Sequence, residues 1–338
     1  MAKHQVAVVQ AGSRLFDTQG TLNCMGTLCR EAAQRGARLI VFPEAYIGGY
    51  PKGLDFGARV GTRTSSGRND FLRYLRSAVE VPSPEVAQIG QFAQDANAWL
   101  VVGVIEREGA TLYCSVLFFG PDGTLLDRHR KLMPTASERL IWGMGDGSTL
   151  PVLKTGIGKI AAAICWENYM PALRMAMYSR EVSLWCAPTV DDRDIWQSSM
   201  RHIAYEGRCF VLSACQYLRR DACPADYDCI QGDAPNTELI KGGSVIINPF
   251  GEVLAGPIYG EEAILSAEID LDDVVRGKFD LDVTGHYARP DLFELKVDTR
   301  ARCAVVLEPL RLPQHSEQCN APALASEEID TVRRGDRQ

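Results

Sequence analysis

Short apolar runs alternate with amphipathic segments along the chain. Nine runs have the composition of β-strands: residues 5–10, 38–44, 99–106, 115–120, 159–165, 183–188, 209–214, 243–249 and 263–270. Several are apolar at every position, which is typical of strands covered on both faces. The pattern therefore predicts an α/β fold with a large buried core.

Helical spacing of apolar residues predicts helices over 22–32, 83–97 and 196–204. The second opens on Ser83 and Pro84, which suit the N-cap and the first helical position. Turn sequences "PDG" and "NPFG" join neighbouring strands as hairpins. Hairpins make their strands antiparallel, so we expect mixed sheets.

No composition shift or Gly/Ser linker divides the chain before about residue 300. We therefore predict one domain over residues 1–310. Residues 311–338 are polar and predict a tail that is flexible or ordered by a neighbouring chain. Residues 51–70, rich in Gly, Arg and Ser, predict a long surface loop.

The net charge of the 338-residue chain is −7, which argues against binding to nucleic acid or to an anionic membrane. No apolar run reaches the roughly 18 residues of a membrane span, and "MAKHQVAVVQ" lacks the apolar region of a signal peptide. A cytoplasmic location is the prediction.

Eleven cysteines occur, mostly inside apolar elements, which indicates reduced thiols packed as small hydrophobic residues. There is no C-x-x-C pair, and the five histidines are far apart in sequence. Neither a metal site nor a phosphate-binding motif is predicted, so we expect no cofactor.

Cys165 is the first candidate for chemistry, because it ends the strand of "AAAICWEN" and precedes another helical stretch. A sharp strand-to-helix turn exposes a nucleophile, and a helix N-terminus favours the thiolate. The alternative is one more packed thiol. A nucleophilic thiol also needs a base, and neither His129 nor His202 lies in an orienting motif.

Two further side chains become candidates beside it. Glu44 ends the strand of "VFPEAYIGGYP" among aromatic residues, where desolvation would raise its pKa towards that of a general base. Lys131, in "DRHRKLMP", could lower the pKa of a nearby thiol and stabilise developing negative charge. Taken singly, each could equally be an ordinary solvated residue.

Together the blocks "FPEAYIGGYPKG", "HRKLMPTASERLIWGMGDGS" and "CWENYMPALR" resemble the three signature blocks of the nitrilase superfamily. The resemblance runs from "VAVVQA" to "GHYARPDLFEL", and Trp166-Glu167 after the cysteine is typical of the true nitrilase branch. It implies a catalytic triad of Glu44, Lys131 and Cys165. It also implies a second acid, Glu138, beside the lysine.

The resemblance further implies a four-layer α-β-β-α sandwich of two mixed sheets, and homo-oligomers that grow from dimers into spirals or filaments. The segments 170–178 and 195–204 are candidate pairing surfaces, unless they are buried against their own sheet. Trp166 is expected to form a wall of the substrate pocket. Tyr50, Thr135 and Trp142 are weaker candidates for its lining.

The function implied is hydrolysis of a nitrile to carboxylic acid and ammonia, through a thioimidate and an acyl-thioester on Cys165. Aryl, arylaliphatic and aliphatic nitriles all remain possible substrates. The alternatives are an amidase or carbamylase and a cyanide-degrading hydrolase with the same triad. A non-catalytic assembly protein is the alternative from another class.

Overall fold

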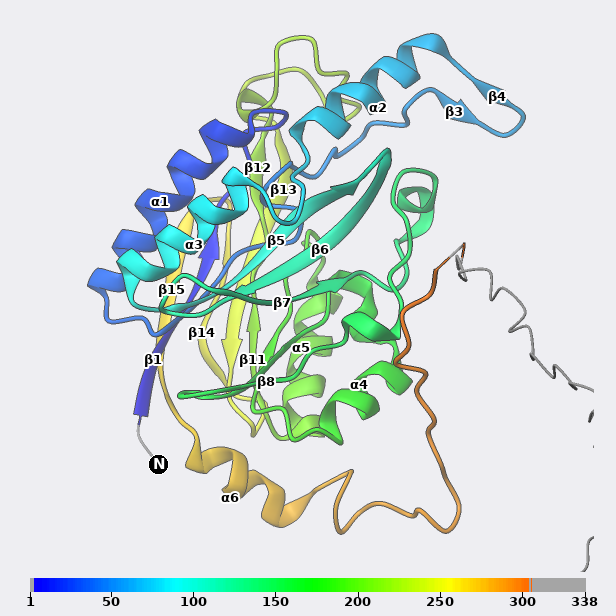
Figure 1. The fold of residues 1–338 in the computed structure, drawn as a ribbon. Helices are drawn as coiled ribbons and strands as arrows, with labels where there is room; N and C mark the ends of the chain where they lie inside the picture. The colour runs from blue at the N-terminus through cyan, green and yellow to red at the C-terminus, as the bar shows by residue number, and fades with distance from the viewer. Residues whose placement is uncertain (1–2, 304, 306–338) are drawn as a thin grey trace, which may run out of the picture. The chain divides into compact units, whose positions relative to one another are not determined.

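Two mixed β-sheets face each other in this computed structural model, which describes residues 3–303 and 305 (Figure 1). The first sheet has the strand order β15-β1-β2-β5-β6-β7. Its strands are β1 (Lys3–Gln10), β2 (Leu39–Val41), β5 (Trp99–Glu108), β6 (Thr111–Phe119), β7 (Leu125–Arg130) and β15 (Ala263–Asp270). Strands β1, β2 and β5 are parallel, and the other neighbours pair antiparallel.

The second sheet has the order β12-β13-β11-β10-β9-β8, with β14 paired to β13. Its strands are β8 (Leu153–Thr155), β9 (Gly158–Ala162), β10 (Leu184–Cys186), β11 (Phe210–Ser213), β12 (Tyr217–Arg219), β13 (Glu238–Ile247) and β14 (Val253–Tyr259). Here β9, β10 and β11 are parallel. The hairpin sequences "PDG" and "NPFG" join β6 to β7 and β13 to β14, as predicted.

Helices cover the outer face of each sheet (Figure 1). The helices of the described residues are α1 (Thr18–Gln34), α2 (Ser65–Ser77), α3 (Pro84–Ala96), α4 (Pro171–Tyr178), α5 (Asp194–Gly207) and α6 (Asp272–Asp280), of which α1, α3, α4 and α5 form these outer layers. Short 3₁₀ helices are η1 (Ala136–Leu140), η2 (Gly147–Thr149), η3 (Cys165–Tyr169) and η4 (Arg220–Ala222). Apolar side chains of α1 and α3 pack on the first sheet, and those of α4 and α5 on the second.

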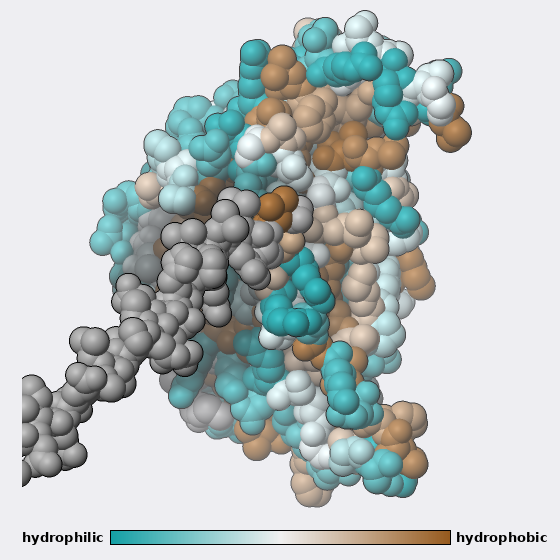
Figure 2. Space-filling model, turned by 45° about the vertical axis from the view of Figure 1, so that its right-hand side comes forward, coloured by the Kyte–Doolittle hydropathy of each residue, from teal (hydrophilic) through white to brown (hydrophobic). Residues whose placement is uncertain are grey.

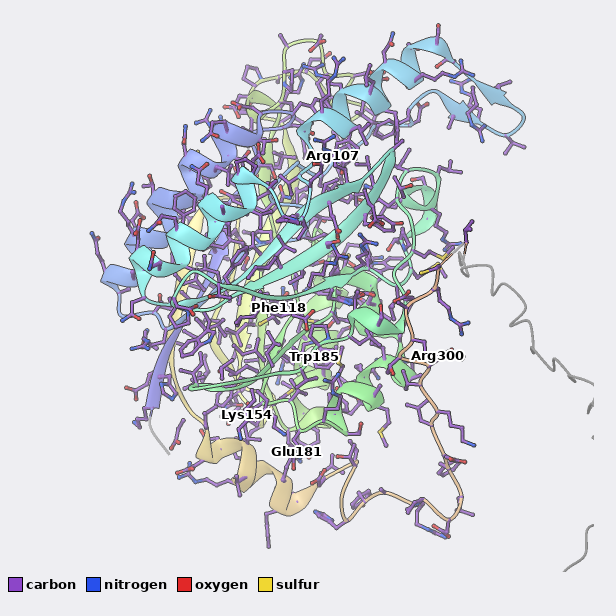
Figure 3. All side chains as sticks on the ribbon, in the orientation of Figure 1. Arg107, Phe118, Lys154, Glu181, Trp185 and Arg300 are labelled. Atoms are coloured by element: carbon purple, nitrogen blue, oxygen red, sulfur yellow. The ribbon has the colours of Figure 1, made fainter. Side chains whose placement is uncertain are left out.

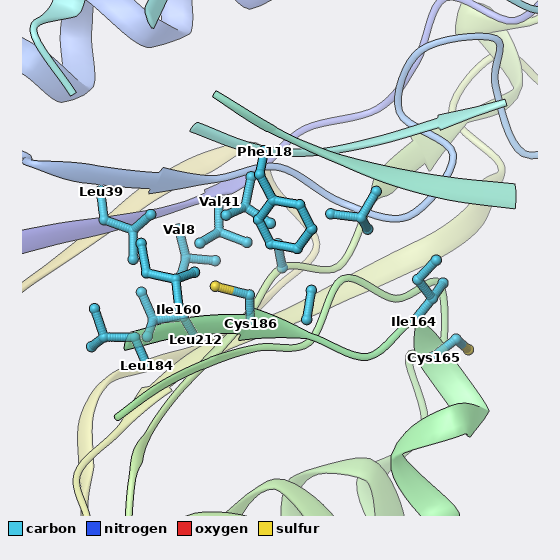
Figure 4. Packing of buried hydrophobic residues seen from close by; sticks show 14 of the residues in the cluster. Val8, Leu39, Val41, Phe118, Ile160, Ile164, Cys165, Leu184, Cys186 and Leu212 are labelled. Carbon is cyan, nitrogen blue, oxygen red and sulfur yellow. The ribbon is translucent and has the colours of Figure 1, made fainter. Parts of the chain in front are cut away.

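The core between the sheets follows from the alternation of side chains along each strand. Val8 and Phe118 of the first sheet meet Leu184 and Leu212 of the second (Figure 4). The opposite face of the second sheet packs on its helices, where the side chain of Trp185 is fully buried (Figure 3). The four-layer α-β-β-α prediction is confirmed.

The predicted α3 begins as its sequence indicates, because the Ser83 side chain accepts a hydrogen bond from the N–H of Val86 at 3.3 Å. The stripe of apolar residues on α5 is buried against the second sheet. That stripe is therefore not a free pairing surface. Only Ile195 and Tyr205 of this helix are large apolar side chains left exposed.

The prediction of a surface loop over 51–70 is wrong in part. A small hairpin of β3 (Ala58–Arg59) and β4 (Thr62–Arg63) lies within it, and α2 begins at Ser65. The Thr64 hydroxyl caps this helix by accepting from the N–H of Gly67 at 3.1 Å.

Contacts divide the chain after Ala301 into a large unit and a short C-terminal one. The domain boundary at residue 310 stays a prediction, and the proposed tail, 311–338, lies outside the described residues. Of the helices that the structure describes, none combines the length and the apolarity needed to cross a membrane.

Candidate active site

Glu44, Lys131 and Cys165 each lie just beyond a strand, at the ends of β2, β7 and β9. Strand β7 is antiparallel to β6, which is antiparallel to β5, so β7 runs in the same direction as β2. The carboxyl ends of β2 and β7 therefore lie at the same end of the first sheet, and β9, which precedes Cys165, belongs to the second sheet. Figure 4 shows Cys165 beyond the end of its strand, apart from Cys186 in the core.

Lys131 is fully buried and is held between two carboxylates. Its Nζ donates to Glu44 Oε1 at 2.7 Å and to Glu138 Oε2 at 2.9 Å. Burial lowers the pKa of Lys131, but the charges of Glu44, Cys165 and their neighbours raise it by more, and the net direction is upward. The ammonium group is therefore a fixed positive charge inside the site.

Glu44 is also fully buried. Burial raises its pKa, Lys131 lowers it, and the net direction is upward, as the sequence predicted. The Cys114 thiol lies 3.6 Å from Oε1, whereas the buried Oε2 has no hydrogen-bond partner among the residues described. A buried carboxylate with a raised pKa and one unpaired oxygen is suited to accepting a proton.

Gly103 of β5 makes room for the segment that carries Glu44. A Cβ atom at this glycine would lie 2.1 Å from the Pro43 carbonyl oxygen and 2.8 Å from the Glu44 Cα. Any side chain here would therefore collide with the backbone that positions Glu44.

Cys165 opens η3 with φ of 50°, a left-handed backbone conformation that is uncommon for residues other than glycine. Its N–H donates to the Pro188 carbonyl at 2.8 Å, and its Sγ receives a hydrogen bond from the Thr189 hydroxyl at 3.2 Å. Strain of this kind concentrates at functional turns. The sharp turn expected after the strand is therefore present.

The expected thiolate-favouring environment is outweighed by burial. Burial and the negative charge of Glu44 raise the pKa of Cys165, whereas Lys131 and Thr189 lower it, and the net direction is upward. The 3₁₀ helix η3 is short, so its dipole adds little stabilisation of a thiolate. A thiol with a raised pKa needs a nearby base to accept its proton before it can attack.

Glu138 connects the lysine to the residues expected around the pocket. Its Oε1 accepts from the Tyr50 hydroxyl at 2.8 Å, and its Oε2 accepts from the Thr135 N–H at 2.6 Å. The Trp142 ring lies 5.4 Å from Lys131 Nζ and 5.8 Å from the Tyr50 ring. Tyr50, Thr135 and Trp142 thus surround the lysine and Glu138.

Trp166 is 42% exposed, next to the buried Cys165. Its indole N–H donates to Asp191 Oδ2 at 2.9 Å, and Arg193 stacks over its ring at 5.0 Å. The indole, which directly follows the buried thiol in sequence, is thus held in place by Asp191 and Arg193.

The alternative base, the remaining cysteines and a possible metal site were also considered from the sequence. The ring nitrogens of His129 contact Glu167 and the carbonyl of Thr149, so this histidine is not available to Cys165 as a base. The ten described cysteines are all unpaired, as predicted. Within residues 3–303, no group of three or more His, Cys, Asp or Glu residues is arranged to hold a metal ion.

The sequence did not predict three residues that contact the proposed triad: Thr189 beside Cys165, and Cys114 and Gly103 beside Glu44. Thr189 follows β10, the parallel neighbour of the strand before Cys165, so strand order could have pointed to it. A glycine inside an otherwise apolar strand is a signal of close backbone approach. Nothing in the sequence distinguishes Cys114 from the other packed thiols.

The carbon-nitrogen hydrolase family model matches residues 5–279. A nitrilase of Bradyrhizobium diazoefficiens is 56% identical over 302 residues, covering 89% of this chain and 94% of the relative. An aliphatic nitrilase of Sinorhizobium fredii is 54% identical, covering 90% and 99%. An arylacetonitrilase of Trametes versicolor is 53% identical, covering 87% and 96%.

Solved structures show the same fold at low sequence identity. The NitFhit protein of C. elegans superposes with a TM-score of 0.70 at 19% identity, covering 92% of this chain and 71% of that one. Nit3 of Saccharomyces cerevisiae superposes with a TM-score of 0.63 at 20% identity, covering 84% and 96%. With this fold, this family match and these relatives, the chain belongs to the nitrilases of the carbon-nitrogen hydrolase family.

Proposed function

We propose that the protein hydrolyses organic nitriles to carboxylic acid and ammonia, with Cys165 as nucleophile, Glu44 as proton carrier and Lys131 as a fixed positive charge. Glu138 is proposed to orient the lysine. The observation that carries the proposal is the buried contact of Lys131 Nζ with both carboxylates, Glu44 and Glu138. Both triad neighbours also act on the thiol: Glu44 raises the pKa of Cys165 and Lys131 lowers it.

In the first half of the reaction, Glu44 accepts the proton of the Cys165 thiol as sulfur attacks the nitrile carbon. The new carbon–sulfur bond leaves negative charge on nitrogen, and Glu44 returns the proton there. The product is a thioimidate. Lys131 stabilises the negative charge that develops during the attack.

In the second half, water adds to the thioimidate carbon while Glu44 transfers a proton from the water to nitrogen. The tetrahedral species expels ammonia and leaves an acyl-thioester. A second water then releases the carboxylic acid and restores the thiol. Overall, one nitrile and two waters give one acid and one ammonia.

The substrates proposed are aryl, arylaliphatic or aliphatic nitriles. Relatives of similar identity are named aliphatic nitrilase and arylacetonitrilase, which supports the class without separating its members. The half-exposed Trp166 next to Cys165 suits an apolar substituent. Amidase, carbamylase and cyanide-degrading activities on the same triad become outcomes of the test.

The test is ammonia release, with product identified by chromatography, from benzonitrile, phenylacetonitrile, mandelonitrile, short dinitriles, cyanide and the matching amides. Wild type is compared with Cys165→Ala. We expect acid and ammonia from one or more organic nitriles, lost in the variant. Turnover of amides or of cyanide alone would contradict the proposal, and so would a fully active Cys165→Ala.

We also propose a homo-oligomer built from dimers and a cytoplasmic location. Exposed apolar side chains on the outer helices support association: Met175, Ile195, Tyr205, Val275 and Phe279. Figure 2 shows brown apolar patches among polar ones on the face it presents. Unpaired thiols at all ten described cysteines support a reducing compartment. Light scattering of the purified protein tests the first proposal.

A further inference from the structure

One buried carboxylate touches the backbone on both sides of the proposed reaction centre. Glu167 Oε1 accepts from the N–H of Leu132 at 2.5 Å, and its Oε2 accepts from the N–H of Ile164 at 2.8 Å. Leu132 directly follows Lys131, and Ile164 directly precedes Cys165. A single side chain therefore connects the segment of the lysine with the segment of the nucleophile.

His129 completes this arrangement and is as deeply buried as Glu167. Its Nε2 lies 2.9 Å from Glu167 Oε2, and its Nδ1 lies 2.6 Å from the carbonyl oxygen of Thr149. A carbonyl only accepts, so Nδ1 carries a proton. Although burial opposes both shifts, Glu167 raises the pKa of His129 and His129 lowers the pKa of Glu167, which favours the shared proton on Nε2. His129 and Glu167 are thus an imidazolium–carboxylate pair.

We propose that Glu167 and His129 are positioning residues that fix Lys131 relative to Cys165. This inference rests on the roles proposed for those two residues. Because the carboxylate is planar and rigid, its two oxygens fix the N–H groups of Leu132 and Ile164 at a set distance and orientation to each other. The imidazolium keeps that carboxylate charged and oriented, because a charged acceptor makes the stronger hydrogen bonds. Displacing either segment would separate the ammonium group from the nucleophile.

A purely structural ion pair is the alternative, and Glu106 of β5 supplies its control. Glu106 is 1% exposed and pairs with Arg128 and Arg130, the two residues that flank His129 on β7. Glu106 contacts neither the Lys131 nor the Cys165 side chain in the hydrogen bonds of the structure. Glu106→Gln therefore perturbs a buried carboxylate of β5 that is paired with the strand of His129, without touching the connection described above.

The test compares Glu167→Gln with Glu106→Gln. Glutamine keeps the volume but offers one acceptor oxygen and one NH₂ group, so either the Leu132 or the Ile164 N–H must face a donor. We expect kcat to fall about 100-fold in Glu167→Gln with little change in KM, since small misplacement of reacting groups has effects of that order. Glu106→Gln should keep kcat even where its melting temperature falls equally.

A second measurement does not use turnover. The rate at which iodoacetamide alkylates Cys165, followed by mass spectrometry of its peptide, reports the charge that Lys131 places near the thiol. It should fall in Glu167→Gln and stay unchanged in Glu106→Gln. If Glu167→Gln does not fold, His129→Gln replaces it, with both backbone contacts kept and an expected loss of kcat of about 10-fold.

The results separate the two levels of inference. An inactive Cys165→Ala together with wild-type kcat and alkylation in Glu167→Gln, or in His129→Gln if that variant is needed, would overturn the positioning role alone. An active Cys165→Ala would overturn the proposed function itself. Equal losses of kcat in Glu167→Gln and Glu106→Gln would assign both pairs a structural role only.

Discussion

Lys131 Nζ lies 2.7 Å from Glu44 Oε1, and neither side chain is exposed to solvent. Removing one member of a buried ion pair leaves the other charge without compensation, and costs about 3–5 kcal/mol of stability. Breaking the pair is therefore costly to stability as well as to the proposed chemistry, and the two effects can be separated by mutation.

Lys131→Met should lower kcat by at least about 100-fold, because the charge that stabilises the developing anion is lost. Chemical denaturation should show the loss of stability given above. In Lys131→Met/Glu44→Gln the charge of Glu44 is also removed and only that of Glu138 remains, so part of the lost stability should return while activity stays absent. Additive destabilisation in the double variant would show that the pair is not coupled.

The pH profile of kcat/KM should have an acid limb above the ordinary glutamate pKa. The pKa of Glu44 is raised from 4.5, and Glu44 must be deprotonated to accept the thiol proton. Activity should therefore fall as pH decreases, starting above pH 4.5. The charge of Glu138 contributes to this upward shift, so Glu138→Gln should move the limb to lower pH. An acid limb at the same pH in Glu138→Gln would show that the charge of Glu138 does not affect the pKa of Glu44.

Thr189→Val should slow the reaction by about 2- to 10-fold, the effect of one hydrogen bond. The Thr189 hydroxyl donates to Cys165 Sγ and lowers the pKa of the thiol. Without it, that pKa rises further and deprotonation becomes harder. Thr189→Ser keeps the hydroxyl and should retain most of the rate. Steady-state kinetics and alkylation of Cys165 check both variants.

Trp166→Ala should change substrate preference more than stability. The ring is 42% exposed, so little burial is lost, whereas a large side chain next to Cys165 is removed. We expect the ratio of kcat/KM for phenylacetonitrile over a short aliphatic nitrile to change by about 10-fold or more. Trp166→Phe, which keeps an aromatic wall, should change the ratio less. Identical ratios in all three proteins would exclude Trp166 from the pocket.

The His129–Glu167 pair should give stability a defined pH window. Burial lowers the pKa of His129, but Glu167 raises it by more, and the net value is above 6.5. Burial raises the pKa of Glu167, but His129 and two backbone N–H groups lower it by more, to below 4.5. Asp127, also on β7, adds to the upward shift of His129.

The raised histidine contributes stability that is complete below pH 6.5 and is lost as pH rises through its folded-state pKa. The lowered glutamate contributes stability that is complete above pH 4.5 and is lost as pH falls through its folded-state pKa. Urea unfolding of wild type and Glu167→Gln should therefore differ most between pH 4.5 and 6.5. A difference that grows steadily with pH would contradict an imidazolium at His129.

Strand periodicity predicted an α/β fold with mixed sheets, whereas the resemblance to the nitrilase superfamily implied the four layers and the three residues of the proposed triad. Glu44, Lys131 and Cys165 each follow a strand end. Chain direction brings Glu44 and Lys131 to the same end of the first sheet, whereas Cys165 follows β9 of the second sheet. The strand predicted over 159–165 ends earlier in the structure, at Ala162. The left-handed turn at Cys165 depends on contacts such as that with the Pro188 carbonyl, which is remote in sequence.

Partners of the triad were harder to predict. Glu167 was part of a recognised motif, yet its contacts with Leu132 and His129 depend on how two sheets are brought together. The net pKa of Cys165 was also beyond local reasoning, because it is the balance of burial against several charges. Only three-dimensional packing decides which of these effects is larger.

Left-handed backbone occurs at Ala45, Ala136 and Cys165, three of the eight non-glycine positions with positive φ in the described part of the chain. Each such residue costs about 1–2 kcal/mol relative to a relaxed conformation. Glycine would relax all three turns, but at Cys165 it would also delete the sulfur. An inactive Cys165→Gly protein should therefore resist heat better than Cys165→Ala, which makes the nucleophile position a place where selection for chemistry has opposed selection for durability.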